Sequence, residues 1–199
     1  MIVGKRVRLR PIERDDLPRF VGWLGDLEVC ANLTLVLGPG LAQEERWYES
    51  VLALPPLEQP LAVEALEVGG TWRHVGSAGV HGVDWRNRST EIGLFLGDKS
   101  VWDRGLGTEL TELLLRHAFA DLNLHRVWLR VFADNARARR VYKKVGFRLE
   151  GTLREADYRD GHYRDVLVYS VLAPEWGARR EGRAGQGRKP TKRTERKHG

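Results

Sequence analysis

Two glycines stand at the start of a helical pattern in the stretch VWDRGLGTELTELLLRHAF, residues 101–119. After Gly105 and Gly107, apolar residues recur at helical spacing, which predicts an amphipathic helix that reaches about residue 121. The first N–H groups of a helix lack intrahelical acceptors, and the helix dipole adds partial positive charge there. Glycine lets a ligand approach this backbone because it has no Cβ atom. The stretch therefore favours a loop that binds a phosphate-bearing ligand, although a tight strand-to-helix turn without a ligand would show the same pattern.

The residues around the glycines exclude two common phosphate loops. A Walker loop needs lysine and then serine or threonine after its last glycine, whereas Thr108 and Glu109 follow Gly107. A Rossmann fingerprint needs a third glycine at the position of Leu110. The loop belongs to neither class.

The rest of the chain predicts strands and helices that would make a mixed α/β domain around one sheet. Alternating or continuous apolar runs predict strands over residues 5–12, 61–68, 71–85, 89–97 and 126–132, followed by two strands joined at Asp160-Gly161. The first of these strands ends at a proline and is expected at the sheet edge. Further helices are predicted from Asp15-Asp16 to residue 24, over 42–54, and over 135–146 with asparagine and glycine at its ends.

The composition indicates one domain of ordinary globular type. The chain has 199 residues, 42% of them hydrophobic, and no apolar run approaches the roughly 18 residues of a membrane span. No signal-peptide pattern opens the chain, and its single cysteine cannot form an internal disulfide. We therefore expect a cytoplasmic protein in which Cys30 is a buried thiol. The histidines show no metal-ligand spacing, and no metal site is expected.

Positive charge is concentrated at the end of the chain. Residues 173–199 contain nine Lys or Arg and three Asp or Glu, a difference that equals the net charge of +6. This composition predicts a domain over residues 1–172 and a disordered basic tail over 173–199. The tail could contact RNA or the ribosome through phosphates, or it could be a solvated segment without a partner.

A second set of residues lies about thirty positions after the glycine loop. Its pattern is N-x-x-A-x-x-x-Y-x-K-x-G-F from residue 135 to residue 147, with Glu150-Gly151 next. Together with Gly-x-Gly-Thr-Glu and the early stretch RVRLRPIERDDLPRFVGWLGDLEV, it resembles the GNAT superfamily of N-acetyltransferases, most closely the branch of the RimJ and RimL ribosomal-protein acetyltransferases. The resemblance covers about residues 3–172. The superfamily's loop has Gln or Arg where this chain has Trp102, which is often found in this branch.

The resemblance implies the GNAT fold, a mixed sheet flanked by helices with a V-shaped splay between two strands. It implies acetyl-CoA as donor, with the pyrophosphate on residues 102–108 and the pantetheine arm along residues 93–97, where a bulge would separate the strands. The residues implied to bind the cofactor are Phe95, Leu96, Gly97, Trp102, Arg104, Gly105, Leu106, Gly107, Thr108, Asn135 and Ala138.

The resemblance also implies catalytic roles. Tyr142 matches the tyrosine that acts as general acid near the thioester sulfur, although it could be a packing residue. Asn135 could contact the cofactor, cap its helix, or do both. Arg130 occupies the position of the glutamate base of RimI-type relatives, which leaves Glu91 as the candidate general base, or as an exposed strand carboxylate. Glu150 is expected at the surface.

The acceptor is implied to be a primary amine. RimJ and RimL act on protein N-termini, whereas other members of the branch acetylate polyamines, amino acids, antibiotics or nucleotide sugars. We expect a protein N-terminus; the alternatives are a small amine, a non-catalytic acyl-CoA sensor, or an RNA- or ribosome-associated protein. The acceptor site is expected at residues 23–37 and 47–54 and at the YRDGHYRD hairpin. A homodimer is common in this branch, but the sequence specifies no interface.

Overall fold

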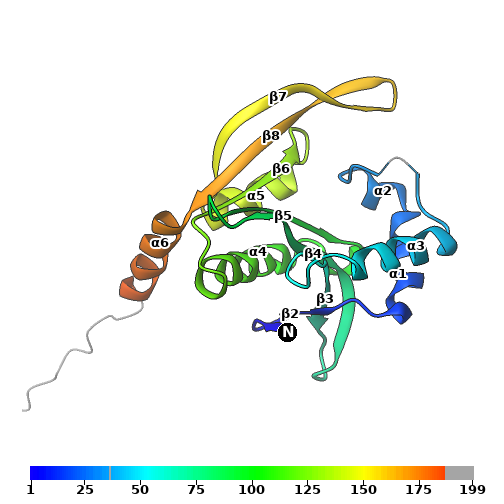
Figure 1. Cartoon of the computed structure of the whole chain (residues 1–199), viewed down its shortest axis with the longest axis horizontal. Helices are drawn as coiled ribbons and strands as arrows, with labels where there is room; N and C mark the ends of the chain where they lie inside the picture. Colours follow the sequence, from blue (N-terminus) through cyan, green and yellow to red (C-terminus); the bar gives the residue numbers. More distant parts are fainter. Residues whose placement is uncertain (36, 187–199) are drawn as a thin grey trace, which may run out of the picture.

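The predicted strands form one eight-stranded sheet in the computed structural model, which describes residues 1–35 and 37–186 (Figure 1). The strand order across the sheet is β1-β2-β3-β4-β5-β6-β8-β7. The strands are β1 (Ile2–Val3), β2 (Val7–Pro11), β3 (Leu61–Leu66), β4 (Trp72–Asp84), β5 (Ser89–Leu96), β6 (Arg126–Phe132), β7 (Arg148–Arg159) and β8 (His162–Leu172). Of the neighbouring pairs in this sheet, β5 and β6 run parallel and the others antiparallel.

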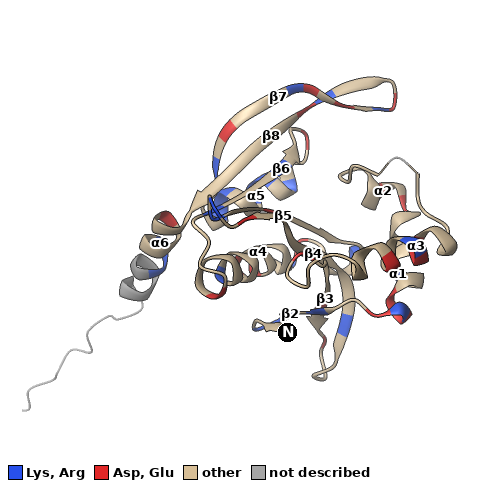
Figure 2. Cartoon of the chain, viewed as in Figure 1, with Lys and Arg blue, Asp and Glu red and all other residues tan. Residues whose placement is uncertain are grey.

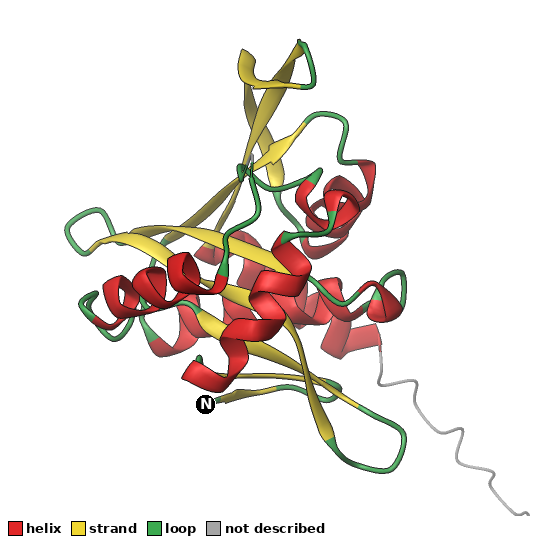
Figure 3. Ribbon diagram, turned by 90° about the vertical axis from the view of Figure 1, so that its right-hand side faces the viewer, coloured by secondary structure: helices red, strands yellow, loops and turns green. Residues whose placement is uncertain are grey.

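Helices cover both faces of the sheet (Figure 3). They are α1 (Leu17–Leu24), α2 (Leu27–Cys30), α3 (Leu41–Leu52), α4 (Leu106–Arg116), α5 (Ala136–Val145) and α6 (Ala173–Gln186). Short helical turns η1 (Arg14–Asp16) and η2 (Lys99–Val101) precede α1 and α4, and a π-helical turn η3 (His117–Asp121) extends α4 to residue 121, as the apolar spacing predicts. None of the described helices is long and apolar enough to cross a membrane.

The apolar faces of these helices build two cores. The larger one joins the predicted face of α4, including Leu110 and Leu114, to the sheet and to α5. The smaller one joins Leu17 and Phe20 of α1 to Tyr48 of α3. Cys30 is buried as predicted, and its thiol donates to the carbonyl oxygen of Leu24 (3.0 Å).

The strand expected at the sheet edge is an inner strand. β2 pairs on one side with β3 and on the other with the short β1, in the register Ile2↔Leu9 and Val3↔Arg8. The chain turns back at Gly4, whose N–H donates to the carbonyl oxygen of Val7 (2.8 Å). The edge-strand prediction is wrong because two residues of β1 are too few to give a strand pattern in the sequence.

The sheet opens between β5 and β6. These strands pair only from Ser89↔Arg126 to Glu91↔Trp128, while β5 continues to Leu96 and β6 to Phe132. Each strand keeps its other neighbour along this length, β4 for β5 and β8 for β6. The V-shaped splay is confirmed, but the bulge expected at 93–97 is not found: β5 keeps a continuous register with β4 from Ile92 to Leu96. The gap arises because each strand follows its antiparallel partner.

The end of the domain extends beyond residue 172. The prediction of a disordered tail from residue 173 is wrong for residues 173–186, which form α6. Trp176 packs on Phe119 with ring centroids 5.4 Å apart, and Glu175 pairs with Arg148 (2.9 Å). The prediction failed because it used the average composition of residues 173–199, which does not show these two anchoring residues. Residues 187–199 of the predicted tail lie outside the described residues, so a truncation that tests the tail should begin after residue 186.

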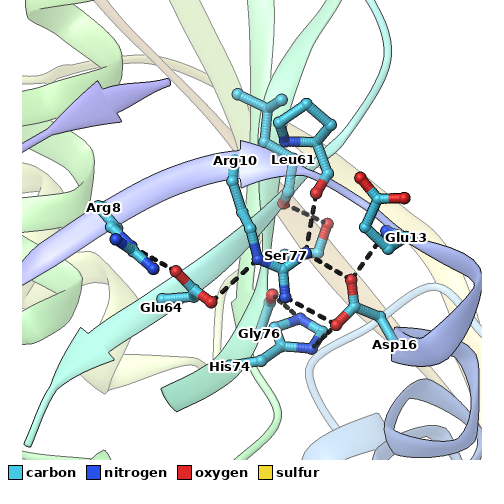
Figure 4. A network of polar contacts seen from close by, with 10 residues as sticks. Arg8, Arg10, Glu13, Asp16, Leu61, Glu64, His74, Gly76 and Ser77 are labelled. Atoms are coloured by element: carbon cyan, nitrogen blue, oxygen red, sulfur yellow. Dashed lines mark hydrogen bonds and ion pairs between the residues drawn. The ribbon is translucent and has the colours of Figure 1, made fainter. Parts of the chain in front are cut away.

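A network of buried charges joins β2, β3, β4 and the start of α1 (Figure 4). Arg10 donates to both carboxylate oxygens of Asp16 (2.6 and 2.8 Å) and to Glu64 (2.9 Å). Asp16 also accepts from the N–H of Glu13 (2.9 Å) and lies 3.0 Å from Nδ1 of His74. Asp16 is the N-cap of α1, but its side chain binds these groups instead of capping the helix. The network fixes α1 against the sheet.

We expect Asp16→Asn to lower the free energy of unfolding by about 3 kcal/mol, because removing one carboxylate of a buried ion-pair network leaves Arg10 with Glu64 as its remaining charged partner. Burial opposes ionisation of Asp16, but the hydrogen bonds from Arg10 and Glu13 outweigh it and lower the pKa of the carboxyl group. Its contribution is therefore present above the unfolded pKa of about 3.9 and is lost as the pH falls through the lower folded pKa. Urea unfolding at neutral and acidic pH measures both effects. The exposed neighbour variant Asp15→Asn is the control, and equal stability of the two variants would contradict the prediction.

Candidate active site

A cavity of about 980 Å³ lies at the gap between β5 and β6. Its walls are the open part of β5, the start of α4, the end of β6, the first turns of α5, the segment after α2, and the hairpin of β7 and β8. Beyond Glu91, the edge of β5 that faces the gap has no strand partner among the described residues. The cavity thus offers an unpaired strand edge and a helix N-terminus to the same ligand.

The glycine loop has the backbone that its sequence predicts. Gly105 is the N-cap of α4 with φ 79° and ψ 4°, a left-handed conformation that favours glycine. A Cβ atom at Gly107 would come no closer than 3.9 Å to its nearest neighbour, so the fold itself does not require glycine there. Trp102 donates from Nε1 to the carbonyl oxygen of Leu96 (2.8 Å), and the guanidinium of Arg137 lies 4.3 Å from its ring. Trp102 therefore ties the loop to the end of β5.

Most of the residues predicted to bind the cofactor line this cavity. They are Phe95, Leu96, Trp102, Gly105, Leu106, Gly107, Thr108, Asn135 and Ala138. Gly97 and Arg104 do not line it. Gly97 lies beneath the ring of Trp23 and donates its N–H to Val75 (2.9 Å), and the carbonyl oxygen of Arg104 accepts from Arg6 (3.0 Å). The chain leaves the sheet after Leu96, which turns Gly97 away from the gap.

The helix α5, which forms one wall of the cavity, is rich in Lys and Arg (Figure 2). Arg137, Arg140 and Lys144 line the cavity beside the glycine loop. The run NARARRVYKK is the signal in the sequence for this basic face. At the start of the helix, Asn135 accepts from the N–H of Ala138 (3.0 Å), which confirms its capping role. Its contact with a cofactor stays a prediction.

Tyr142 lies on the inner side of α5 at the cavity wall. It is buried, and its ring packs on Phe147 with centroids 5.7 Å apart. Its hydroxyl has no hydrogen-bond partner within the described part of the chain. Burial raises the pKa of Tyr142 to about 12, so the hydroxyl stays protonated at neutral pH. The residue can therefore both pack and donate a proton.

Glu91 lines the cavity where β5 and β6 separate. Both of its carboxylate oxygens accept from Arg130 of β6, Oε1 from Nε (2.9 Å) and Oε2 from Nη2 (3.2 Å). Each carboxylate oxygen of Glu91 therefore accepts one charge-assisted hydrogen bond. The role of Glu91 as the base that accepts the proton of the amine stays a prediction, and Arg130 competes with the amine for its oxygens.

A smaller cavity of about 200 Å³ is lined by residues of β4 and β5 and contains a residue that sequence analysis did not single out. His81 of β4 lines it, opposite Glu91 in the strand register. Leu33, Gly93, Leu94 and Phe95 line both cavities, so the two spaces share a wall. The signal in the sequence was a histidine on a strand that flanks the predicted cofactor strand.

The far end of the large cavity lies between the segment after α2 and the hairpin of β7 and β8. Arg159 in the hairpin donates to three carbonyl oxygens of that segment, those of Cys30, Leu33 (2.6 Å) and Leu35 (2.7 Å). Arg164 donates to the carbonyl oxygen of Ala31 (3.1 Å). The predicted turn at Asp160-Gly161, with φ of 51° and 84°, brings both arginines to this position. Two segments that are distant in the sequence thus form one wall.

The segment that contains the glycine loop and Tyr142 is similar in sequence to known proteins. The sequence profile of the family described as "Acetyltransferase (GNAT) domain" matches residues 6–148. The chain belongs to the GNAT acetyltransferase family. It is an acetyltransferase with acetyl-CoA as donor, and its GNAT fold is confirmed.

Three relatives show how the family varies. "Uncharacterized N-acetyltransferase p20" of Bacillus licheniformis is 26% identical over 172 residues, 86% of this chain and 96% of that protein. "Putative ribosomal N-acetyltransferase YdaF" of Bacillus subtilis is 34% identical over 101 residues, 51% of this chain and 55% of that protein. The structure of spermidine N-acetyltransferase from Vibrio cholerae with CoA and spermine has a TM-score of 0.77 and 22% identity, over 87% of this chain and 99% of that one. Two of these names mention a target, which is ribosomal for YdaF and spermidine for the Vibrio cholerae enzyme.

Proposed function

We propose that this GNAT enzyme transfers the acetyl group to the N-terminal amine of a protein. The observation that carries the proposal is the ion pairing of the carboxylates that line the large cavity. Its five acidic lining residues each form an ion pair with Arg or Lys: Glu28 with Lys99, Glu91 with Arg130, Asp103 with Arg137, Asp134 with Arg164, and Asp157 with Arg164.

This pairing disfavours a polycation. A polyamine carries several positive charges and needs carboxylates that are free to receive them, since specificity rests on complementary charge. An α-amine on a peptide needs only one proton acceptor, and its chain can contact apolar and backbone groups. Apolar residues Val29, Leu33, Leu153 and Ala156 line the acceptor end and fit such a chain. YdaF, named as a ribosomal acetyltransferase, supports the proposal, whereas the Vibrio cholerae neighbour supports spermidine as the alternative.

The same geometry supports assignments for the donor. The N–H groups at the start of α4, with the basic wall of α5, would bind the pyrophosphate, because both present positive charge to one side of the gap. The pantetheine arm would run along the open edge of β5. Tyr142, which stays protonated at neutral pH, would donate its proton to the sulfur of CoA as the C–S bond breaks.

The test of the acceptor is transfer from labelled acetyl-CoA into a cell extract that is then separated by size. Label in the protein fraction, mapped to N-terminal residues, is the expected result. Label in the small-molecule fraction, reproduced with purified spermidine, would replace the proposal by the small-amine alternative. Binding of acetyl-CoA without label in either fraction would favour an acyl-CoA sensor.

We expect Arg159→Ala to raise the KM for the acceptor roughly tenfold, equivalent to about 1.4 kcal/mol, with the KM for acetyl-CoA nearly unchanged. The arginine holds the carbonyl oxygens of residues 30–35, which form the acceptor end and lie away from the glycine loop. Steady-state kinetics with each substrate varied in turn measures the split. Arg154→Ala, an exposed arginine on β7, is the control. Equal rises in both KM values would show that the hairpin supports the whole domain instead.

A further inference from the structure

The acceptor amine arrives as an ammonium ion and must lose a proton before it can attack the thioester. Glu91, the carboxylate at the splay, has both oxygens bound to Arg130. A neighbouring group without such an ion pair would accept the proton more readily. The strand register places His81 directly across from Glu91, so the two side chains leave the sheet on the same face.

The imidazole of His81 occupies a slot made by two glycines. Gly79 and Gly93 face one another across β4 and β5. A Cβ atom at Gly93 would lie 2.9 Å from Nε2 of His81, and one at Gly79 would lie 3.7 Å from its Cε1. The ring therefore lies across this glycine pair and places Nε2 beside Gly93, which lines both cavities. Any side chain at position 93 would compete with the ring for this space.

The ring is also free to take up a proton. Neither of its nitrogens has a hydrogen-bond partner within the described residues, and His81 is accessible at the smaller cavity. The charged groups that face it are Glu91 on β5 and Glu58 in the segment before β3, with Arg130 of β6 behind Glu91. Desolvation lowers the pKa of His81, and the two glutamates oppose this shift. The neutral ring is thus the resting form at neutral pH.

We propose that His81 is the general base of the acetyl transfer, with Glu91 as a positioning residue that stabilises the protonated ring. Nε2 takes a proton from the ammonium group, and the free amine attacks the thioester carbon to form the C–N bond. As the C–S bond breaks, Tyr142 gives its proton to sulfur and regains one from the new amide nitrogen. His81 then releases its proton to water. This assignment rests on acetyl transfer to an amine and holds for a peptide or a small amine.

The test is the pH dependence of kcat/KM for the full chain and for His81→Gln, with an N-terminal peptide as acceptor. At pH 7 we expect His81→Gln to lower kcat/KM roughly 100-fold, which is within the range of general-base catalysis. The loss should shrink as the pH rises above the pKa of the acceptor's α-amine, about 7.7–8.0, because the free amine is then supplied by solution. Acetyl-CoA affinity and the unfolding temperature should not change. An equal loss at every pH, or no loss, would overturn the assignment.

Two further variants sharpen the outcome. His125→Gln replaces a histidine that lines neither cavity and should keep the wild-type profile. Glu91→Gln should move the acidic limb to lower pH, because Glu91 raises the pKa of His81, and should lower the plateau of kcat/KM by less than His81→Gln does. Abolished activity in Glu91→Gln with a normal His81→Gln profile would make Glu91 the base. Repeating the series with spermidine keeps the His81 test valid if protein N-termini prove not to be acceptors.

Discussion

Gly105→Glu is expected to abolish measurable acetyl-CoA binding in isothermal titration. Gly105 has a φ of 79°, and a residue with a Cβ atom in this conformation costs about 1–2 kcal/mol. The new carboxylate would also stand at the N-terminus of α4, where a pyrophosphate needs the positive end of the helix dipole. The steric and electrostatic effects act together, so this variant has the largest expected effect on binding.

Two controls separate these effects. Gly105→Ala adds only the backbone strain and should weaken binding roughly tenfold, since about 1.4 kcal/mol corresponds to a factor of ten. Gly151→Glu places the same charge on β7, where no atom lies within 4 Å of an added Cβ atom, and should bind normally. Normal binding by Gly105→Glu would remove the glycine loop from the cofactor site.

Tyr142→Phe is expected to lower kcat by about 100-fold or more while acetyl-CoA affinity is retained, as for loss of a general acid. Phenylalanine keeps the ring contact with Phe147, and the hydroxyl that is lost has no hydrogen-bond partner among the described residues. Folding stability should therefore change little. Because the pKa of Tyr142 is about 12, its deprotonation should not produce a basic limb near neutral pH.

The comparison of kcat with affinity decides the role of Tyr142. Single-turnover kinetics and titration with acetyl-CoA measure the two quantities separately. Val141→Ala, the neighbouring position on the cavity wall, is a packing control that keeps the hydroxyl. Parallel loss of turnover and affinity in Tyr142→Phe would show that Tyr142 is structural. Retained turnover would require another proton donor.

The sequence by itself determined the local elements and the parts of the site that depend on one segment. The spacing of apolar residues placed α4, Asn135 and Gly146 bounded α5, and Asp160-Gly161 made the hairpin turn. Such features depend on the backbone preferences of a few adjacent residues, which the sequence contains. The motifs that resemble GNAT enzymes then led to the fold, the donor and a cavity that contains nine of the eleven residues predicted to bind the cofactor.

Only the tertiary structure decided how charged and polar groups are shared between distant segments. Arg130 of β6 forms an ion pair with Glu91 of the neighbouring strand β5. Arg159 donates to carbonyl oxygens more than 120 residues earlier in the chain. The ring of His81 has room to lie on the sheet because Gly79 and Gly93, on neighbouring strands, have no side chains. The helix α6 also depends on a distant contact, because Trp176 packs on Phe119 in a segment whose composition predicts disorder. These outcomes rest on packing between segments, and the charge or polarity of a residue does not specify which distant group it will meet.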